Sequence, residues 1–198
     1  MFIRTASGDE PMHHAVTMDA NGCLPDYTIR PGNHSDVQQI QKIEVAAGTL
    51  FTEVNMAEVA ADPPPDGRLL RRLMSQGQLW VAECGEHVVG YATVLLVDAD
   101  AHLDQVSVEP GHTRRGIGTA LIDRCDRWAT SIAATRMTLF TFADVPWNAP
   151  LYRRIGFVEI ETNQLGAELQ DLWQRECETD LHTWHRVAMA RNTGRSPI

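Results

Sequence analysis

Apolar and polar residues recur with two different periods along this chain, and the two periods predict a fold that mixes strands and helices. Runs of alternating or β-branched and aromatic residues predict strands. The predicted strands are residues 27–31, 79–84, 87–97, a segment ending at Val108, 137–142, a segment after Phe157, and 184–190. Tight turns are predicted at Gly85-Glu86 and at residues 98–100.

Apolar residues spaced three or four apart predict helices between these strands. The first helix carries apolar residues from Val37 to Phe51, and Ser35 or Asp36 can cap its start. Further helices are predicted at residues 67–75, 117–132, 147–156 and 165–177. The three prolines of the segment 62–67 predict an irregular loop.

The order of these elements predicts an α/β (α+β) fold, in which helices cover both faces of a mixed, mostly antiparallel central sheet. A chain of 198 residues suits one domain with a sizeable core. We expect this domain at residues 26–191, preceded by a flexible segment at 1–25 and followed by a flexible tail at 192–198.

The charge and the cysteines narrow the classes of partner and cofactor. The formal net charge is −9, which argues against nucleic acid and against an anionic membrane surface as partners. Cys23, Cys84, Cys125 and Cys177 are far apart, so neither a disulfide nor a metal site is expected. No apolar run reaches the ~18–20 residues that span a bilayer, and no secretory signal is evident, so the cytoplasm is the expected location.

The segment 114–119, Arg-Arg-Gly-Ile-Gly-Thr, carries the strongest chemical signal. It lies between a predicted strand and a long amphipathic helix. The first N–H groups of a helix have no partner within it and attract anions. Gly116 and Gly118 allow a phosphate to approach these groups, and Arg114 and Arg115 add forked positive donors. The segment therefore predicts a phosphate or pyrophosphate site.

Two common nucleotide sites do not fit this segment. A P-loop requires a lysine after its last glycine, and the only lysine of the chain is Lys42. A dinucleotide fingerprint requires a third glycine three residues after Gly118, where this chain has Leu121.

Three motifs in order resemble those of the GNAT superfamily of acetyl-CoA-dependent N-acetyltransferases. They are Val-x-Val-x-Pro at 106–110, Arg-Arg-Gly-x-Gly at 114–118, and Asn-x-x-x-Tyr-x-x-x-Gly-Phe at 148–157. The resemblance covers residues 27–191. It implies the acyl-CoA N-acyltransferase fold, in which the sheet splays at the cofactor site, and transfer of acetyl from acetyl-CoA to a primary amine in a ternary complex.

The resemblance also implies roles for individual residues. The backbone of Val106, Ser107 and Val108 would bind the pantetheine arm, and Asn148 would hydrogen-bond it. Tyr152 would donate a proton to the departing thiolate, as a phenol with a pKa near ~10 can. The pyrophosphate would bind at Thr113, Arg114, Arg115, Gly116, Gly118 and Thr119. Thr113 departs from the family, which often has Gln or Arg there, and this implies weaker cofactor binding.

The sequence leaves the acceptor side open. Glu44, His102 and Asp104 are alternative general bases, and Phe51, Phe142 and Trp147 are expected to wall the acceptor site. The expected acceptor is a small-molecule or peptide amine, and the acidic surface would attract cationic amines. One alternative is a catalytically weak acyl-CoA-binding sensor or interaction module of the same fold. Another is an enzyme that transfers a longer acyl chain, or that acylates a protein N-terminus. A homodimer is compatible with the sequence.

Overall fold

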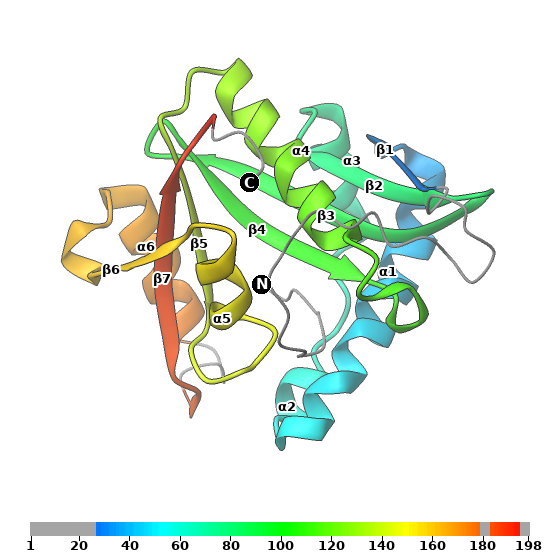
Figure 1. The fold of residues 1–198 in the computed structure, drawn as a ribbon, viewed down its shortest axis with the longest axis horizontal. Coiled ribbons are helices and arrows are strands. Elements are labelled where there is room, and N and C mark those ends of the chain that lie inside the picture. Colours follow the sequence, from blue (N-terminus) through cyan, green and yellow to red (C-terminus); the bar gives the residue numbers. More distant parts are fainter. Residues whose placement is uncertain (1–26, 179–182, 195–198) are drawn as a thin grey trace.

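The computed structural model describes residues 27–178 and 183–194, which form a seven-stranded sheet in the order β1-β2-β3-β4-β5-β7-β6 (Figure 1). The strands are β1 (Tyr27–Pro31), β2 (Leu79–Cys84), β3 (His87–Val97), β4 (Asp100–Val108), β5 (Arg136–Phe142), β6 (Val158–Ile160) and β7 (Arg186–Asn192). All neighbouring strands are antiparallel except β4 and β5, which are parallel. The mixed, mostly antiparallel sheet predicted from the sequence is therefore confirmed.

Helices cover both faces of this sheet, with α4 and α5 on one face and α1, α3 and α6 on the other (Figure 1). The helices are α1 (Val37–Gly48), α2 (Ala57–Ala60), α3 (Gly67–Ser75), α4 (Ile117–Ser131), α5 (Ala149–Arg154) and α6 (Ala167–Cys177). The first helix was predicted to reach Phe51, but α1 ends at Gly48 and Phe51 lies in a 3-10 turn (Thr49–Val54). The short α2 was not predicted.

The start of α1 differs from the prediction. Asp36 occupies the N-cap position but makes no side-chain bond to the helix. Its carboxylate instead accepts hydrogen bonds from the backbone N–H of Asn33 and from Arg30. Asn33 caps the preceding 3-10 turn (His34–Asp36), and Asn33 and Asp36 form a capping box there.

The domain was predicted at residues 26–191, with a flexible segment on either side. The predicted flexible segment 1–25, with Cys23, lies outside the described residues. At the other end, β7 continues to Asn192, and Gly194 N–H donates to Asp126 on α4. The described structure therefore extends past residue 191.

Alternating residues of β3 supply the cores on both sheet faces. Ala92 and Val94 pack with α4, whereas Tyr91 packs with α1 and α3. On α1, Ile40 and Ile43 are 0% and 1% exposed and contact that second core. Each such side chain stabilises the fold by about 1.5–3 kcal/mol, so the helical spacing seen in the sequence fixes which side of α1 faces the sheet.

A β-bulge interrupts the pairing of β3 with β4. Thr93 pairs with Gln105, but the next residue of β3, Val94, pairs with Leu103. Asp104 is therefore the extra residue on β4. A bulge of this kind shifts the alternation of side chains by one position, so residues after it point to the opposite face from the one their numbering predicts.

The bulge decides which residues of β4 face α1. Leu103 before the bulge and Val106 after it both lie in the core under α4. Asp104 and Gln105 both line a pocket on the opposite face, and the Ser107 hydroxyl reaches Glu44 of α1 on that face. Three polar residues of β4, Asp104, Gln105 and Ser107, are thus gathered on one side of the sheet.

Strands β4 and β5 stay together only at their beginnings. They pair through Ala101 with Met137 and His102 with Thr138, and no later pair is formed although both strands continue. Figure 1 shows the two strands meeting at one end and separating toward the other. Beyond residue 102, β4 therefore has one backbone edge that is not paired with a neighbouring strand.

Candidate active site

The turn before α4 presents an open helix N-terminus. Arg114 and Gly116 both have left-handed backbones, with φ of 61° and 76°. The first hydrogen bond within the helix runs from the Ala120 N–H to the Gly116 carbonyl, and no side chain caps the helix. The N–H groups of residues 117–119 therefore point out of the positive end of a 15-residue helix.

The side chains around this turn differ in what they can contribute. Arg114 and Arg115 are exposed and form no ion pair with the described residues, so both are available to an anion. The Thr113 hydroxyl instead donates to the Pro110 carbonyl at 3.0 Å, which holds the turn together. Gly118 is buried, whereas Thr119 is half-buried in the first turn of the helix.

Asn148 and Tyr152 are both fully buried, on α5 or at its start. The amide oxygen and nitrogen of Asn148 and the hydroxyl of Tyr152 have no hydrogen-bond partner among the described residues. Tyr152 packs edge-on against Phe157 and lies in the core that also contains Cys125 of α4. Burial raises the pKa of Tyr152 well above its usual value, so the phenol keeps its proton at neutral pH.

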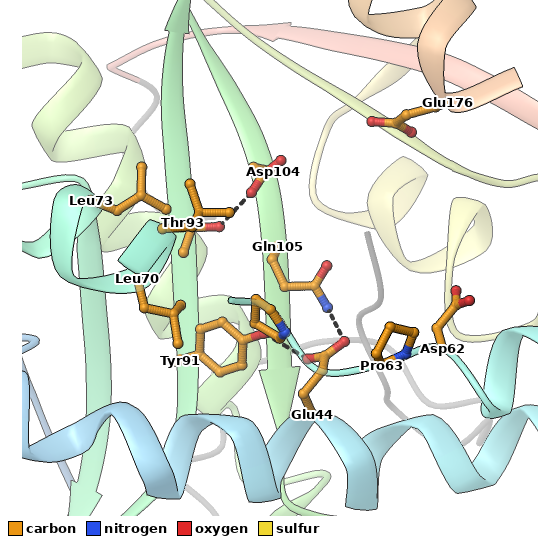
Figure 2. A pocket seen from close by; sticks show the side chains of 12 residues that line it. Glu44, Asp62, Pro63, Leu70, Leu73, Tyr91, Thr93, Asp104, Gln105 and Glu176 are labelled. Atoms are coloured by element: carbon orange, nitrogen blue, oxygen red, sulfur yellow. Dashed lines mark hydrogen bonds between the residues drawn. The ribbon is translucent and has the colours of Figure 1, made fainter. Parts of the chain in front are cut away.

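A cavity of about 300 Å³ lies on the other face of the sheet, between α1, α3, the loop 62–65, strands β3 and β4, and the end of α6. Figure 2 shows its two kinds of wall, with Leu70 and Leu73 on one side and Glu44 and Asp104 facing them. Among the described residues, no basic side chain lines this cavity, whereas four carboxylates do: Glu44, Asp62, Asp104 and Glu176.

Glu44 is fixed in this pocket by three donors. The hydroxyls of Tyr91 and Ser107 each donate to Oε2 at 2.7 Å, and the Gln105 amide donates to Oε1 at 2.8 Å. Figure 2 shows Glu44 reaching from α1 toward Tyr91 and Gln105 on the sheet. A carboxylate that accepts three such bonds is held in one orientation at the pocket wall.

Asp104 is the bulged residue of β4 and lies above Glu44 in the view of Figure 2. The Thr93 hydroxyl donates to its Oδ2 at 2.9 Å (Figure 2). Burial raises the pKa of Asp104, and the hydrogen bond from Thr93 opposes that rise only partly. The carboxyl therefore has a higher proton affinity than an ordinary aspartate.

His102 does not line this pocket. Its Nδ1 is 2.9 Å from the Thr138 hydroxyl, and its ring packs on Phe140 at 4.7 Å. Burial lowers the pKa of His102 to about 4, so the ring is neutral at neutral pH. Of the three alternative bases, only Glu44 and Asp104 are brought together in the pocket.

The aromatic residues expected at the acceptor site lie elsewhere. Phe51, Phe142 and Trp147 pack edge-on in a cluster of their own, and none of them lines the pocket. The three aromatic residues therefore do not belong to this pocket, because Phe51 packs with Phe142 and with residues of the loop that leads to α5.

The site contains residues that sequence reasoning missed. Tyr91 and Gln105 hold Glu44, but nothing in their local sequence distinguishes them from core and strand residues. Arg186 of β7 does not line the pocket itself, but it pairs at 2.5 Å with Glu176, which does, and the Arg186 side chain is only 4% exposed. Its Nε and Nη1 have no partner among the described residues. Arg186 was hidden by its position at the start of a strand far from every motif.

Two kinds of feature are absent from residues 27–178 and 183–194. No group of three or more His, Cys, Asp or Glu side chains in this part of the chain is arranged to hold a metal ion. None of its helices is long and apolar enough to cross a membrane.

Comparison with known proteins relates the chain to one family. Residues 48–157, more than half of the chain, match the model of the acetyltransferase (GNAT) family. A curated relative, the amino-acid acetyltransferase of Mycobacterium tuberculosis, is 28% identical over 161 residues, or 79% of this chain and 81% of the relative.

Solved structures agree in fold. A Mycobacterium tuberculosis protein in complex with CoA and NLQ has a TM-score of 0.62 at 23% identity, over 84% of this chain and 99% of that one. N-acetylglutamate synthase from Neisseria gonorrhoeae, complexed with coenzyme A and N-acetyl-glutamate, has a TM-score of 0.65 at 14% identity. That match covers 85% of this chain but only 35% of the synthase. At these identities the structures establish the fold alone.

Proposed function

Because this chain belongs to the acetyltransferase (GNAT) family, we propose that it moves an acetyl group from acetyl-CoA directly to a primary amine of a small acceptor bound in the pocket beside Glu44 and Asp104. The observation that carries this proposal is the position of the opening between β4 and β5. Tyr152 and Asn148 lie on one face of the sheet and the pocket carboxylates on the other.

The cofactor would bind along the unpaired edge of β4 and end at the turn before α4. The backbone of residues 106–108 can hydrogen-bond the pantetheine arm, and the N–H groups of residues 117–119 with Arg114 and Arg115 can hold the pyrophosphate. The unpaired buried amide of Asn148 suits an amide of the arm. When bound, acetyl-CoA supplies the activated acetyl thioester.

The acceptor side favours an amine. An amine reaches the pocket largely as a cation, and the carboxylates lining the pocket attract it. The name of the mycobacterial relative supports an amino acid as the acceptor.

We assign the proton transfers to two residues. Asp104 accepts a proton from the amine, directly or through one water, because its raised proton affinity suits a base and one of its oxygens is not used by Thr93. Both oxygens of Glu44 already accept hydrogen bonds, so we assign the proton to Asp104 and give Glu44 the role of orienting the amine. Tyr152 donates its proton to the sulfur as it departs.

The cysteines support direct transfer without a covalent enzyme intermediate. Burial raises the pKa of Cys125, which makes its thiol a poor nucleophile. Cys84 and Cys177, the other two cysteines of the described residues, do not line the pocket.

Release of free thiol from acetyl-CoA tests the proposed function. The protein is mixed with acetyl-CoA and a panel of amines that includes amino acids, diamines and simple monoamines. We expect acceptor-dependent thiol release and an acetylated amine by mass spectrometry. Tight CoA binding without turnover on any amine would instead support the sensor function.

Replacing Gly116 with valine should weaken acetyl-CoA binding about tenfold. A β-branched residue at a φ of 76° costs ~1–2 kcal/mol, and relief of that strain rotates the N–H groups of the turn. Isothermal titration calorimetry measures the affinity. Gly111→Val is the control, since Gly111 is in the same loop and a Cβ there meets no atom within 4 Å. Equal affinities of the two variants would remove the turn from the cofactor site.

A further inference from the structure

Thr141 carries a buried hydroxyl group that makes no hydrogen bond within the described structure. Its residue is 1% exposed, and its Oγ1 has no hydrogen-bond partner among the described residues. The other two buried threonines behave differently. The Thr93 hydroxyl donates to Asp104. Thr138, which lies on the same strand as Thr141, is hydrogen-bonded to His102 of β4.

The strand places Thr141 on the face that carries Asn148 and Tyr152. Leu139, two residues earlier on β5, packs in the core with Tyr152 and α4. Residues two apart on a strand share a face, so Thr141 points to the same side. Its partner on β7, Val187, also packs against that core.

Three unpaired buried polar side chains therefore lie on one face of the sheet, beyond the last β4–β5 pair at Thr138. They are Thr141, Asn148 and Tyr152. A buried polar group without a partner destabilises the fold, and valine has nearly the same shape as threonine without the hydroxyl. The hydroxyl of Thr141 thus serves something other than stability.

We propose that the Thr141 hydroxyl hydrogen-bonds the pantetheine arm of acetyl-CoA and, together with Asn148, forms the polar lining of the channel beside β5. The arm offers two amide groups, and a hydroxyl can donate to an amide carbonyl or accept from an amide N–H. The inference rests on the proposed function, which places the arm in the opening between β4 and β5.

Thr141→Val tests this proposal because its effects on stability and on affinity have opposite signs. Without ligand, the melting temperature should stay equal or rise by about 2–4 °C, since an unsatisfied hydroxyl is removed. The affinity for CoA should fall about fivefold, and the affinity for adenosine 3′,5′-bisphosphate, which lacks the arm, should not change. Acetyl-CoA is measured beside CoA. A loss confined to acetyl-CoA would place the bond at the acetyl group and overturn the assignment to the arm.

Two further variants serve as controls. Thr138→Val removes a hydroxyl that is bonded to His102 and should lower the melting temperature. Thr141→Ser keeps the hydroxyl and should retain the affinity for CoA. Unchanged affinity of Thr141→Val for CoA, or a melting temperature lowered as in Thr138→Val, would overturn the inference and leave the proposed function standing. Absence of CoA binding by the unaltered protein would overturn both.

Discussion

Tyr152→Phe is expected to lower kcat about a hundredfold and to leave the affinity for acetyl-CoA nearly unchanged. The phenol is the proposed proton donor to the departing thiolate, and loss of a general acid costs at least 10²-fold, about 2.7 kcal/mol of transition-state stabilisation. The fold should not suffer, because the hydroxyl of Tyr152 has no partner among the described residues. Steady-state thiol release, calorimetry and thermal unfolding give the three quantities.

Tyr91→Phe is the matched control for this variant. It also removes a buried tyrosine hydroxyl, but one that is bonded to Glu44 on the opposite face of the sheet. We expect it to raise the KM of the acceptor more than it lowers kcat. An unchanged kcat in Tyr152→Phe would remove Tyr152 from its assigned role, whatever the control does.

Asp104→Asn should reduce kcat by a similar factor, because the amide cannot accept the proton of the acceptor amine. In the unaltered enzyme, burial raises the pKa of Asp104, so kcat/KM should fall as the pH decreases through that raised pKa. The fall begins at a higher pH than for an ordinary aspartate, whose pKa is near ~4. In Asp104→Asn this acidic limb should be absent from the pH profile.

Glu44→Gln separates the two pocket carboxylates. Since both oxygens of Glu44 already accept hydrogen bonds, we expect this variant to raise the KM of the acceptor and to keep the acidic limb of the pH profile. The reverse pattern, in which Glu44→Gln loses the limb and Asp104→Asn keeps it, would make Glu44 the base.

The parts of the molecule that were predictable from the sequence are those with local causes. The open turn at Gly116 and the helix after it follow from glycines and apolar spacing within a few residues. The hairpin turn at Gly85 likewise has the left-handed glycine that its position requires. The order of strands and helices follows from the same short-range patterns.

The acceptor pocket was not predictable because its causes are not local. One extra residue, Asp104, shifts the alternation on β4 and brings the side chain of Ser107 to Glu44, 63 positions away. No sequence pattern within β4 predicts that bulge. The sequence also offered Glu44, His102 and Asp104 as equals, and only tertiary packing turns His102 toward Phe140 and away from the cavity.

In the proposed reaction, the acetyl thioester and the acceptor amine meet in the opening between β4 and β5. A crystal structure with CoA and an accepted amine tests it directly. We predict the sulfur within hydrogen-bonding distance of the Tyr152 hydroxyl, and the acceptor nitrogen within reach of Asp104, directly or through one water. A CoA molecule whose sulfur lies away from that opening, or an amine bound outside the pocket of Glu44 and Asp104, would contradict the account.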